Sequence, residues 1–282
     1  MTKEKLNSTN KADKAWNKLY DRLYSENLIP DDSRQLKRGS KLPPALFWSA
    51  ATIIILAGIA IMYLKNSGGE KRETLISQTN NETASLVKIL EDGSTVYIAQ
   101  RAALEYPVHF KTEMRSVSLK GEAFFDISKN PDRPFIIETE SVKVEVIGTS
   151  FNIKSTVPTQ FELAVREGRV RITLKKNGRE QILSKNETAI LSDSGFDIKY
   201  KNCDSLLFKY TSNFKFKDES LKNIINVIKR LHPEITIETS GEAESRKLTV
   251  AFANNEPEEM ISLISQALSL NSYRNGNKFI IK

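Results

Sequence analysis

Residue types that could carry out catalysis or bind a metal are scarce in this sequence. Its 282 residues include two histidines, His109 and His232, and one cysteine, Cys203. Neither histidine lies beside a nucleophile turn of the G-x-S-x-G type, and these three residues make no metal-ligand cluster. His232 precedes Pro233 and is better explained as a helix end, where a cationic imidazole is favoured. The sequence therefore predicts no enzyme, no metal site, no cofactor and no internal disulfide.

Two carboxylates are the remaining candidates for chemistry. Glu122 and Asp126 lie four residues apart in a segment with the character of a strand, so their side chains point to the same face. Such a pair can perform acid-base catalysis, but a solvated strand face explains the same spacing. We expect no substrate turnover from this pair.

The charge distribution argues against nucleic acid as a partner. The chain has 42 Lys and Arg residues against 35 Asp and Glu residues, which gives a formal net charge of +7. The basic residues are scattered among the acids, and no nucleic-acid-binding motif is present. We therefore expect no nucleic-acid partner.

A long apolar run predicts a membrane helix at residues 42–64. The run LPPALFWSAATIIILAGIAIMYL contains no charged residue, and about twenty helical residues span a hydrocarbon core of about 30 Å. A cleaved signal peptide is the alternative, but it would begin closer to Met1 and have a shorter apolar region. Basic residues precede the run without an acid among them, which predicts a cytoplasmic N-terminus: Arg34, Lys37, Arg38 and Lys41.

The segments that flank this run have different characters. Residues 1–41 form a short cytoplasmic segment with one helical stripe that includes Trp16, Leu19 and Leu23. An isolated helix of this length is marginally stable, so the stripe needs a protein partner or the membrane surface, and both explanations stay open. Residues 65–84 are polar and contain Gly68 and Gly69, which indicates a linker.

Residues 85–200 have the alternation of an all-β domain. Val142, Val144 and Val146 alternate with charged residues, and Asp92-Gly93 and Asn177-Gly178 supply turns at intervals. Such closely spaced strands predict a sandwich or a related layered roll.

Residues 201–212 are expected to be a connector, and residues 213–282 have the pattern of a small α+β domain. The predicted order is β-α-β-β-α-β, with two helices on one sheet and an extra hairpin at Asn275-Gly276. Asp218 is a candidate N-cap for the first helix. Apolar residues at helical spacing define the two helices: Leu221, Ile224, Ile225, Ile228 and Leu231, then Met260, Ile261, Ile264 and Leu268.

Several ordered motifs resemble the FecR family of single-pass anti-sigma regulators. The run RSVSLKGEAFFDISKNPDRPFIIETESVKVEVIGTSFNI, residues 115–153, resembles the central family signature. LEDGSTVYI at residues 90–98, LEYP at residues 104–107 and VREGRVRI at residues 165–172 resemble further family motifs in the same order. The segment from Phe214 onward resembles the short secretin and TonB-type signalling domain that ends many members.

The resemblance implies a location and two partners. The protein would cross the bacterial inner membrane once, with its N-terminus in the cytoplasm and its C-terminus in the periplasm. The signalling domain of a TonB-dependent outer-membrane receptor would add a strand to the C-terminal domain. An extracytoplasmic-function sigma factor would bind the cytoplasmic segment through Trp16, Leu19 and Leu23. The alternative is a membrane-anchored periplasmic adaptor without sigma-factor contact, which is favoured by a cytoplasmic segment shorter than the family usually has.

The resemblance also draws attention to one peptide bond, and the sequence departs from the family pattern at two positions. Some family members are thought to cleave themselves at a Gly-Thr bond, which here would be Gly148-Thr149, whereas a tight bend is the simpler explanation of Gly148. A glycine of the family's later L-x-x-G-E motif is replaced by Asn186, which we expect in a left-handed conformation. The family's boundary tryptophan is absent, and Phe208 or Tyr210 is expected in its place.

Overall fold

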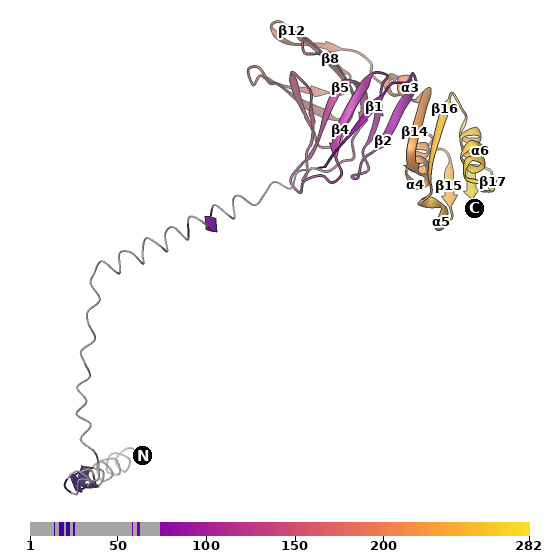
Figure 1. The fold of residues 1–282 in the computed structure, drawn as a ribbon. Coiled ribbons are helices and arrows are strands. Elements are labelled where there is room, and N and C mark those ends of the chain that lie inside the picture. The colour runs from indigo at the N-terminus through magenta and orange to yellow at the C-terminus, as the bar shows by residue number, and fades with distance from the viewer. Residues whose placement is uncertain are drawn as a thin grey trace, which may run out of the picture. The chain divides into compact units, whose positions relative to one another are not determined.

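The computed structural model describes residues 74–282 together with residues 14, 17–19, 21, 22, 25, 58, 61 and 62 (Figure 1). The chain divides into two units, residues 1–69 and residues 70–282. The ten described residues before residue 74 are helical. The predicted membrane helix at residues 42–64 lies outside the described residues, apart from Gly58, Ile61 and Met62. Among the helices that the structure describes, none is long and apolar enough to cross a membrane.

Residues 75–200 form thirteen strands in two layers, which we call the FecR-like part. One layer has the order β1-β4-β5-β6-β7-β10-β11, and the other has the order β13-β12-β9-β8-β5-β3-β2. The strands are β1 (Leu75–Asn80), β2 (Ser85–Ile89), β3 (Thr95–Ile98), β4 (Ala102–Pro107), β5 (Arg115–Asp126), β6 (Phe135–Glu138), β7 (Val142–Val146), β8 (Ser150–Val157), β9 (Gln160–Glu167), β10 (Arg169–Leu174), β11 (Glu180–Ser184), β12 (Glu187–Ser192) and β13 (Gly195–Tyr200).

Strand β5 belongs to both layers and bends at Gly121. Residues 115–120 pair with β4 and β6, whereas residues 121–126 pair with β3 and β8. Gly121 has a φ of 100°, and a Cβ atom there would lie 2.8 Å from Ala102 Cα. Because a side chain would meet backbone at this bend, glycine is the residue that lets one strand serve both layers.

The apolar residues that the sequence pattern assigns to the inside do face a common core. Val142, Val144 and Val146 are buried between the two layers, together with Phe125 and Phe151, whose rings stack at 5.4 Å. The prediction of a mostly β fold with a small α+β part is therefore confirmed.

Two elements lie in ranges that the sequence assigns to a linker and a connector. β1 lies within residues 65–84 and pairs with β4 along its whole length. It has no apolar alternation, because it is an edge strand whose residues are mostly exposed. The short helix α3 (Leu206–Thr211) lies within residues 201–212.

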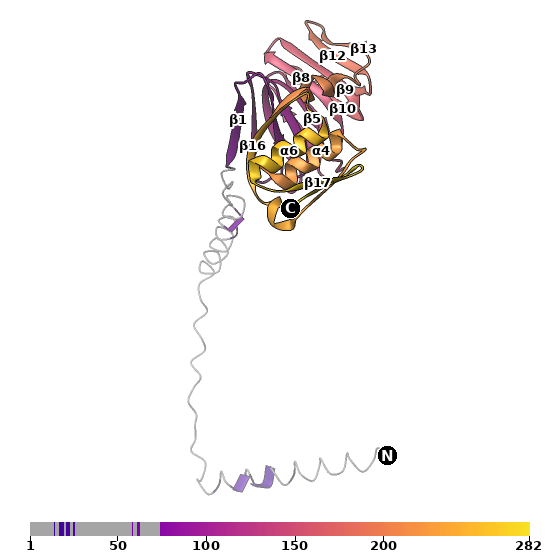
Figure 2. The same cartoon turned by 90° about the vertical axis from the view of Figure 1, so that its right-hand side faces the viewer.

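The C-terminal part contains the two helices that the sequence predicts. Its elements are β14 (Asn213–Ser220), α4 (Leu221–Leu231), β15 (Thr236–Thr239), α5 (Gly241–Glu244), β16 (Lys247–Ala253), α6 (Pro257–Leu268), β17 (Ser272–Asn275) and β18 (Lys278–Ile281). In Figure 2, α4 and α6 face the viewer. The N-cap prediction for Asp218 is wrong: Ser220 caps α4, since its side chain accepts a hydrogen bond from Asn223 N.

The prediction of one sheet for this part is also wrong. β14 and β16 extend the second layer of the FecR-like part, while β15, β18 and β17 form a separate three-stranded sheet. Helix α4 contacts β14 and β15, and α6 contacts β16 and β17, so the helices pack between the two sheets. The reason lies in burial: both sheets place aromatic or aliphatic residues, such as Phe214 and Phe279, into one core around the helices.

Candidate functional site

The FecR-like part and the C-terminal part meet in a continuous sheet. β14 pairs in parallel with β2, with Phe214 opposite Ser85 and Phe216 opposite Val87. On the outer face of this layer, Val87, Tyr97 and Phe124 are buried in the same core as α4 and α6. We call this contact the junction. Because the strands and the core continue across the junction, a displacement of one part is transmitted to the other through packed side chains.

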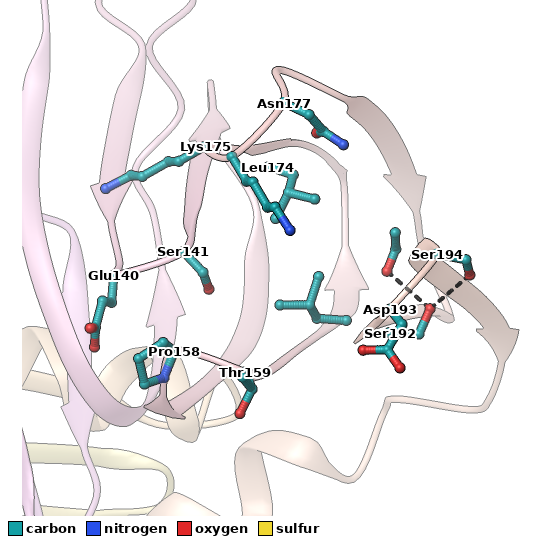
Figure 3. A pocket seen from close by; sticks show the side chains of 13 residues that line it. Glu140, Ser141, Pro158, Thr159, Leu174, Lys175, Asn177, Ser192, Asp193 and Ser194 are labelled. Atoms are coloured by element: carbon teal, nitrogen blue, oxygen red, sulfur yellow. Dashed lines mark hydrogen bonds between the residues drawn. The ribbon is translucent and has the colours of Figure 1, made fainter.

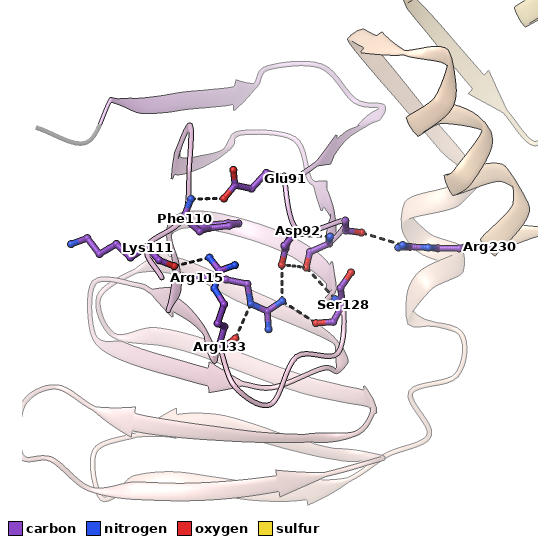
Figure 4. Close-up of polar contacts among 10 residues, drawn as sticks. Glu91, Asp92, Phe110, Lys111, Arg115, Ser128, Arg133 and Arg230 are labelled. Carbon is purple, nitrogen blue, oxygen red and sulfur yellow. Dashed lines mark hydrogen bonds and ion pairs between the residues drawn. The ribbon is translucent and has the colours of Figure 1, made fainter. Parts of the chain in front are cut away.

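A buried ion pair holds the family-like motifs together inside the FecR-like part (Figure 4). Arg115 is 1% exposed, and its Nη1 lies 2.6 Å from Asp92 Oδ2 and 2.9 Å from the Ser128 carbonyl oxygen. Its Nε donates to the Arg133 carbonyl oxygen at 2.9 Å, and its guanidinium lies over the Phe135 ring at 5.3 Å.

This network explains why the motif residues lie where they do. Ser94 Oγ donates to Asp92 Oδ2 at 2.7 Å and accepts from Ser128 N at 3.1 Å. Together these contacts hold the turn after β2 to the end of β5. The segment GEAFFDISKNPDRPF supplies Ser128 and Arg133 to this network, and this end of the segment therefore serves as scaffold.

Glu122 does not lie on a solvated face. Its Oε1 accepts a hydrogen bond from Lys209 Nζ at 2.6 Å and lies 2.9 Å from the Tyr210 hydroxyl, both on α3. The same hydroxyl lies 2.5 Å from Asn152 Oδ1 on β8. Tyr210 is 1% exposed, whereas Phe208 is 69% exposed, so Tyr210 is the residue buried at the boundary where the family has a tryptophan. α3 is thus fastened to the FecR-like part.

The protonation states in this cluster follow from burial and partners. Burial favours a raised pKa for the Glu122 carboxyl, but the hydrogen bonds from Lys209 and Tyr210 outweigh it and leave the pKa below its usual value. Burial raises the pKa of the Tyr210 hydroxyl, and the Glu122 carboxylate raises it further. Tyr210 is therefore a neutral hydrogen-bond donor and Glu122 is a charged acceptor.

Asp126, the second carboxylate on this face, has separate partners. Its Oδ1 accepts from Ser150 Oγ at 2.6 Å, and its Oδ2 lies 3.7 Å from Arg230 Nη1 on α4. Arg230 also donates to the Gly93 carbonyl oxygen at 3.1 Å (Figure 4). A second hydrogen bond runs from Arg230 Nη1 to Thr95 Oγ1 at 3.3 Å. Glu122 and Asp126 thus do share a face, as predicted, but each binds a cation of the C-terminal half.

Two sizeable cavities lie at different ends of the fold. One of about 610 Å³ adjoins the junction and is lined by residues that include Arg166, Phe208, Arg230 and Met260. The other, of about 780 Å³, lies among the turns at the far end of the strands and is lined by residues that include Ser141, Pro158, Leu174 and Ser194 (Figure 3). Among the residues that the structure describes, no three His, Cys, Asp or Glu side chains are grouped to hold a metal.

The Gly148-Thr149 bond lies in a closed bend between β7 and β8. A Cβ atom on Gly148 would lie 2.6 Å from Lys129 Cα, so the bend requires glycine. Thr149 is 4% exposed, and within residues 74–282 its Oγ1 has no hydrogen-bond partner. Ile127 N donates to the Thr149 carbonyl oxygen at 2.9 Å. The hydroxyl is therefore buried beside the bond, without a base that contacts it in the described structure.

The other predicted site residues are mostly outside the described part. Trp16 and Leu23 are not described, whereas Leu19 is helical and 46% exposed. The sequence analysis missed Lys209 and Arg230, which bind the two carboxylates. Their only signal is opposite charge, and nothing in the local sequence indicates that they lie opposite β5.

Comparisons with known proteins agree with the motif analysis. Residues 76–171 match the family model described as FecR protein. No curated protein matches the chain. Two crystal structures of a candidate anti-sigma factor from Parabacteroides distasonis ATCC 8503, at 2.50 Å and 1.65 Å resolution, share 21% and 20% identity with it. Both have a TM-score of 0.45, and the alignment covers 73% of this chain and 98% of theirs.

These two structures are too dissimilar to assign a function. The family match, by contrast, runs from β1 into β10 and includes Asp92, Arg115 and the Gly148-Thr149 bond. By this match, residues 76–171 are a FecR domain.

Proposed function

We propose that the protein is a membrane-anchored anti-sigma regulator that carries a signal from a partner outside the cytoplasm to a sigma factor inside it. Residues 42–64 would anchor it in the bacterial inner membrane, with residues 1–41 in the cytoplasm and residues 74–282 in the periplasm. The FecR match at residues 76–171 and the charge-free run at residues 42–64 support this assignment. The protein transforms no substrate in this role.

The observation that carries the proposal is the junction. A partner that binds the C-terminal part acts on elements that share a sheet with β2 and that contact β5 through Lys209, Tyr210 and Arg230. The C-terminal part then serves as the receiving domain, similar in order of elements to a secretin and TonB-type short N-terminal domain. Its partner would be the signalling domain of a TonB-dependent outer-membrane receptor.

The free edge of β16 is the place where a partner strand would have the most direct effect. In the described structure β16 pairs with β14 alone, and β14 continues the sheet to β2. β15 and β17 also have free edges, but they belong to the separate small sheet. A strand added to β16 gains main-chain hydrogen bonds in the one sheet that reaches the FecR domain.

A pull-down from cells tests the cytoplasmic end of the proposal. The bait is residues 1–41, compared with a Trp16→Ala, Leu19→Ala variant and with an Asn17→Ala, Lys18→Ala control. Recovery of an extracytoplasmic-function sigma factor by the native and control baits, and a loss of at least about tenfold with Trp16→Ala, Leu19→Ala, is expected, since a buried apolar anchor contributes more than exposed polar residues.

The second candidate is a periplasmic membrane-anchored adaptor without sigma-factor contact. It shares the charge-free run at residues 42–64 and the junction with the first candidate. An intact native bait that recovers no sigma factor would favour this adaptor and would remove the anti-sigma assignment.

Self-cleavage at Gly148-Thr149 is a separate proposal that is compatible with either role. Thr149 Oγ1 would attack the Gly148 carbonyl carbon, the C–N bond would break to give an ester and a free amine, and water would hydrolyse the ester. The buried hydroxyl without a described partner supports the proposal. Freshly expressed native protein should yield two fragments while Thr149→Ala stays full length. A single full-length band from both would exclude cleavage.

A further inference from the structure

Four exposed apolar side chains lie at the end of the FecR-like part where β1 begins. Leu75 and Ile76 start β1, and Val108 and Met114 lie in the loop that joins β4 to β5. They are 59%, 38%, 43% and 37% exposed. We call these four residues the β1 patch.

The pairing of the strands places the β1 patch at one end of the domain. Leu75 lies opposite Pro107, and Val108 N donates to the Thr74 carbonyl oxygen at 3.1 Å. The loop of residues 108–114 leads from there directly into β5 at Arg115. In Figure 4, Phe110 and Lys111 lie at the end where β1 begins.

β1 also differs from the sheet edge at the far side of the fold. Its sequence LISQTN has no charge, whereas the edge strand β13 carries Asp197 and Lys199. Exposed edges usually carry charges that prevent association. An uncharged edge with exposed Leu75 and Ile76 therefore indicates a surface that is covered in the membrane-anchored protein.

The length of the chain before β1 identifies what covers it. Ten residues, 65–74, separate the apolar run from Leu75, and a fully extended chain of that length spans at most about 35 Å. The start of β1 is then held close to any bilayer that contains residues 42–64, at an effective concentration on the order of millimolar. Even a weak affinity for lipid is sufficient at that concentration.

Polar side chains near the β1 patch have partners within the FecR-like part. His109 Nδ1 lies 2.9 Å from Glu91 Oε2, and Arg133 Nη2 donates to the Lys111 carbonyl oxygen at 2.6 Å. No concentrated basic face is needed for adsorption, because exposed aliphatic side chains insert at the boundary between headgroups and acyl chains. Binding of this kind should change little with salt.

We propose that the β1 patch is a lipid-binding surface, which seats the FecR domain on the outer leaflet of the membrane that anchors the chain. This inference rests on the proposed membrane anchor. The occupant is the lipid surface itself, through apolar contact of Leu75, Ile76, Val108 and Met114. Seating the domain there would restrict its orientation relative to the partner that reaches β16.

The test uses the full chain in nanodiscs of phosphatidylcholine and phosphatidylglycerol. In a Cys203→Ser background, a single cysteine replaces Val108 or, as the matched control, Val157, and each is labelled with the environment-sensitive dye NBD. Val157 is also 43% exposed, but it precedes Pro158, which lines the cavity at the far end of the strands. Nitroxide-labelled lipids should quench the label at position 108 at least about twofold more than the label at position 157.

A second variant separates lipid contact from other causes of shielding. Leu75→Gln together with Met114→Gln should reduce quenching at position 108 to the level of position 157. Ile182→Gln, a change at an exposed isoleucine on β11, should leave the quenching unchanged. Raising the salt concentration should also leave it unchanged.

Three results would overturn the inference. Equal quenching at positions 108 and 157 would show that the patch faces water. A shielded label that nitroxide lipids do not quench, and that depends on two copies in each disc, would make the patch an interface between copies of the chain. A chain that does not co-elute with nanodiscs would disprove the proposed membrane anchor and, with it, this inference. Co-elution is measured before quenching, so this failure is distinguished from the other two.

Discussion

The FecR domain uses similar ion pairs in its interior and at the junction, but their surroundings differ. Arg115 and Asp92 have side-chain exposures of 1% and 10%, and they connect segments of a single domain. Lys209 and Glu122 have exposures of 59% and 19%, and they connect α3 to that domain. Removing one member of a buried pair leaves an uncompensated charge in a poor solvent, whereas water partly replaces a lost partner at the junction.

The difference between the two ion pairs separates contacts that stabilise the fold from contacts that can change. The interior pair is a fixed part of the domain. The junction contacts of Glu122, Tyr210 and Arg230 are weaker individually and are shared between two parts of the chain. A signal that alters how the C-terminal part sits on β5 therefore has to act on the junction.

The largest effect is expected from breaking the interior pair. Arg115→Met should lower the free energy of unfolding by about 3–5 kcal/mol, since Asp92 is left buried without its cation. Urea denaturation of the full chain, followed by circular dichroism, measures it. Arg171→Met is the matched control: the Arg171–Glu145 pair is 48% and 32% exposed, and its loss should cost under about 1 kcal/mol. Equal effects of the two changes would contradict the comparison.

The next largest effect is expected at the bend that connects the interior network to the junction. Gly121→Ala should lower the free energy of unfolding by about 2–4 kcal/mol, because strain at a positive φ adds to the clash with Ala102. Gly178→Ala has nothing within 4 Å of the added methyl group and should cost about 1 kcal/mol through strain alone. Thermal and urea denaturation of both variants provide the check, and a ranking in the opposite order would refute the role given to Gly121.

A smaller effect is expected from one hydroxyl at the junction. Tyr210→Phe removes the hydroxyl that lies within hydrogen-bond distance of Asn152 and Glu122 but keeps the ring, so the loss should be about 1–2 kcal/mol. Hydrogen exchange should speed up in α3 while the amides around Arg115 keep their protection. Tyr273→Phe, at an exposed tyrosine on β17, should change neither quantity. Uniform loss of protection throughout the FecR domain would mean that Tyr210 belongs to its core.

The smallest effect is a pH dependence confined to the junction. The pKa of Glu122 is lower in the folded protein than its ordinary value of 4.5, so its contribution to stability is present above that value. The contribution is lost as the pH falls through the lowered folded pKa. The protection of α3 against hydrogen exchange, taken relative to intrinsic exchange at the same pH, should therefore fall at acidic pH in the native protein. With Glu122→Gln this fall should be absent, and an unchanged pH response in that variant would assign it to another group.

The local elements were predictable because each depends on a short stretch of chain. The alternation of Val142, Val144 and Val146 predicts a strand, and the spacing of Ile224, Ile225 and Ile228 predicts α4. The left-handed conformation expected of Asn186 is confirmed by its φ of 68°. β1 escaped prediction, since an exposed edge strand carries no apolar pattern.

The site was predictable in part. The sequence places Glu122 and Asp126 on one face of β5, and that arrangement is confirmed. Their partners Lys209 and Arg230 lie far along the chain, and opposite charge alone does not identify which of many cations comes near. The roles of Trp16, Leu19 and Leu23 and of the Gly148-Thr149 bond stay predictions.

By itself the sequence determined the strands, the two helices, the charge-free run at residues 42–64 and the family motifs, because periodicity and motif order are local properties. Only the tertiary structure decided that β14 joins β2, that the C-terminal strands divide between two sheets, and that both carboxylates of β5 face the C-terminal half. The physical reason is that strand pairing and ion pairing across the junction depend on which buried surfaces fit each other. Many pairings satisfy the same alternation, and burial of Val87, Tyr97 and Phe124 against α4 and α6 selects one of them.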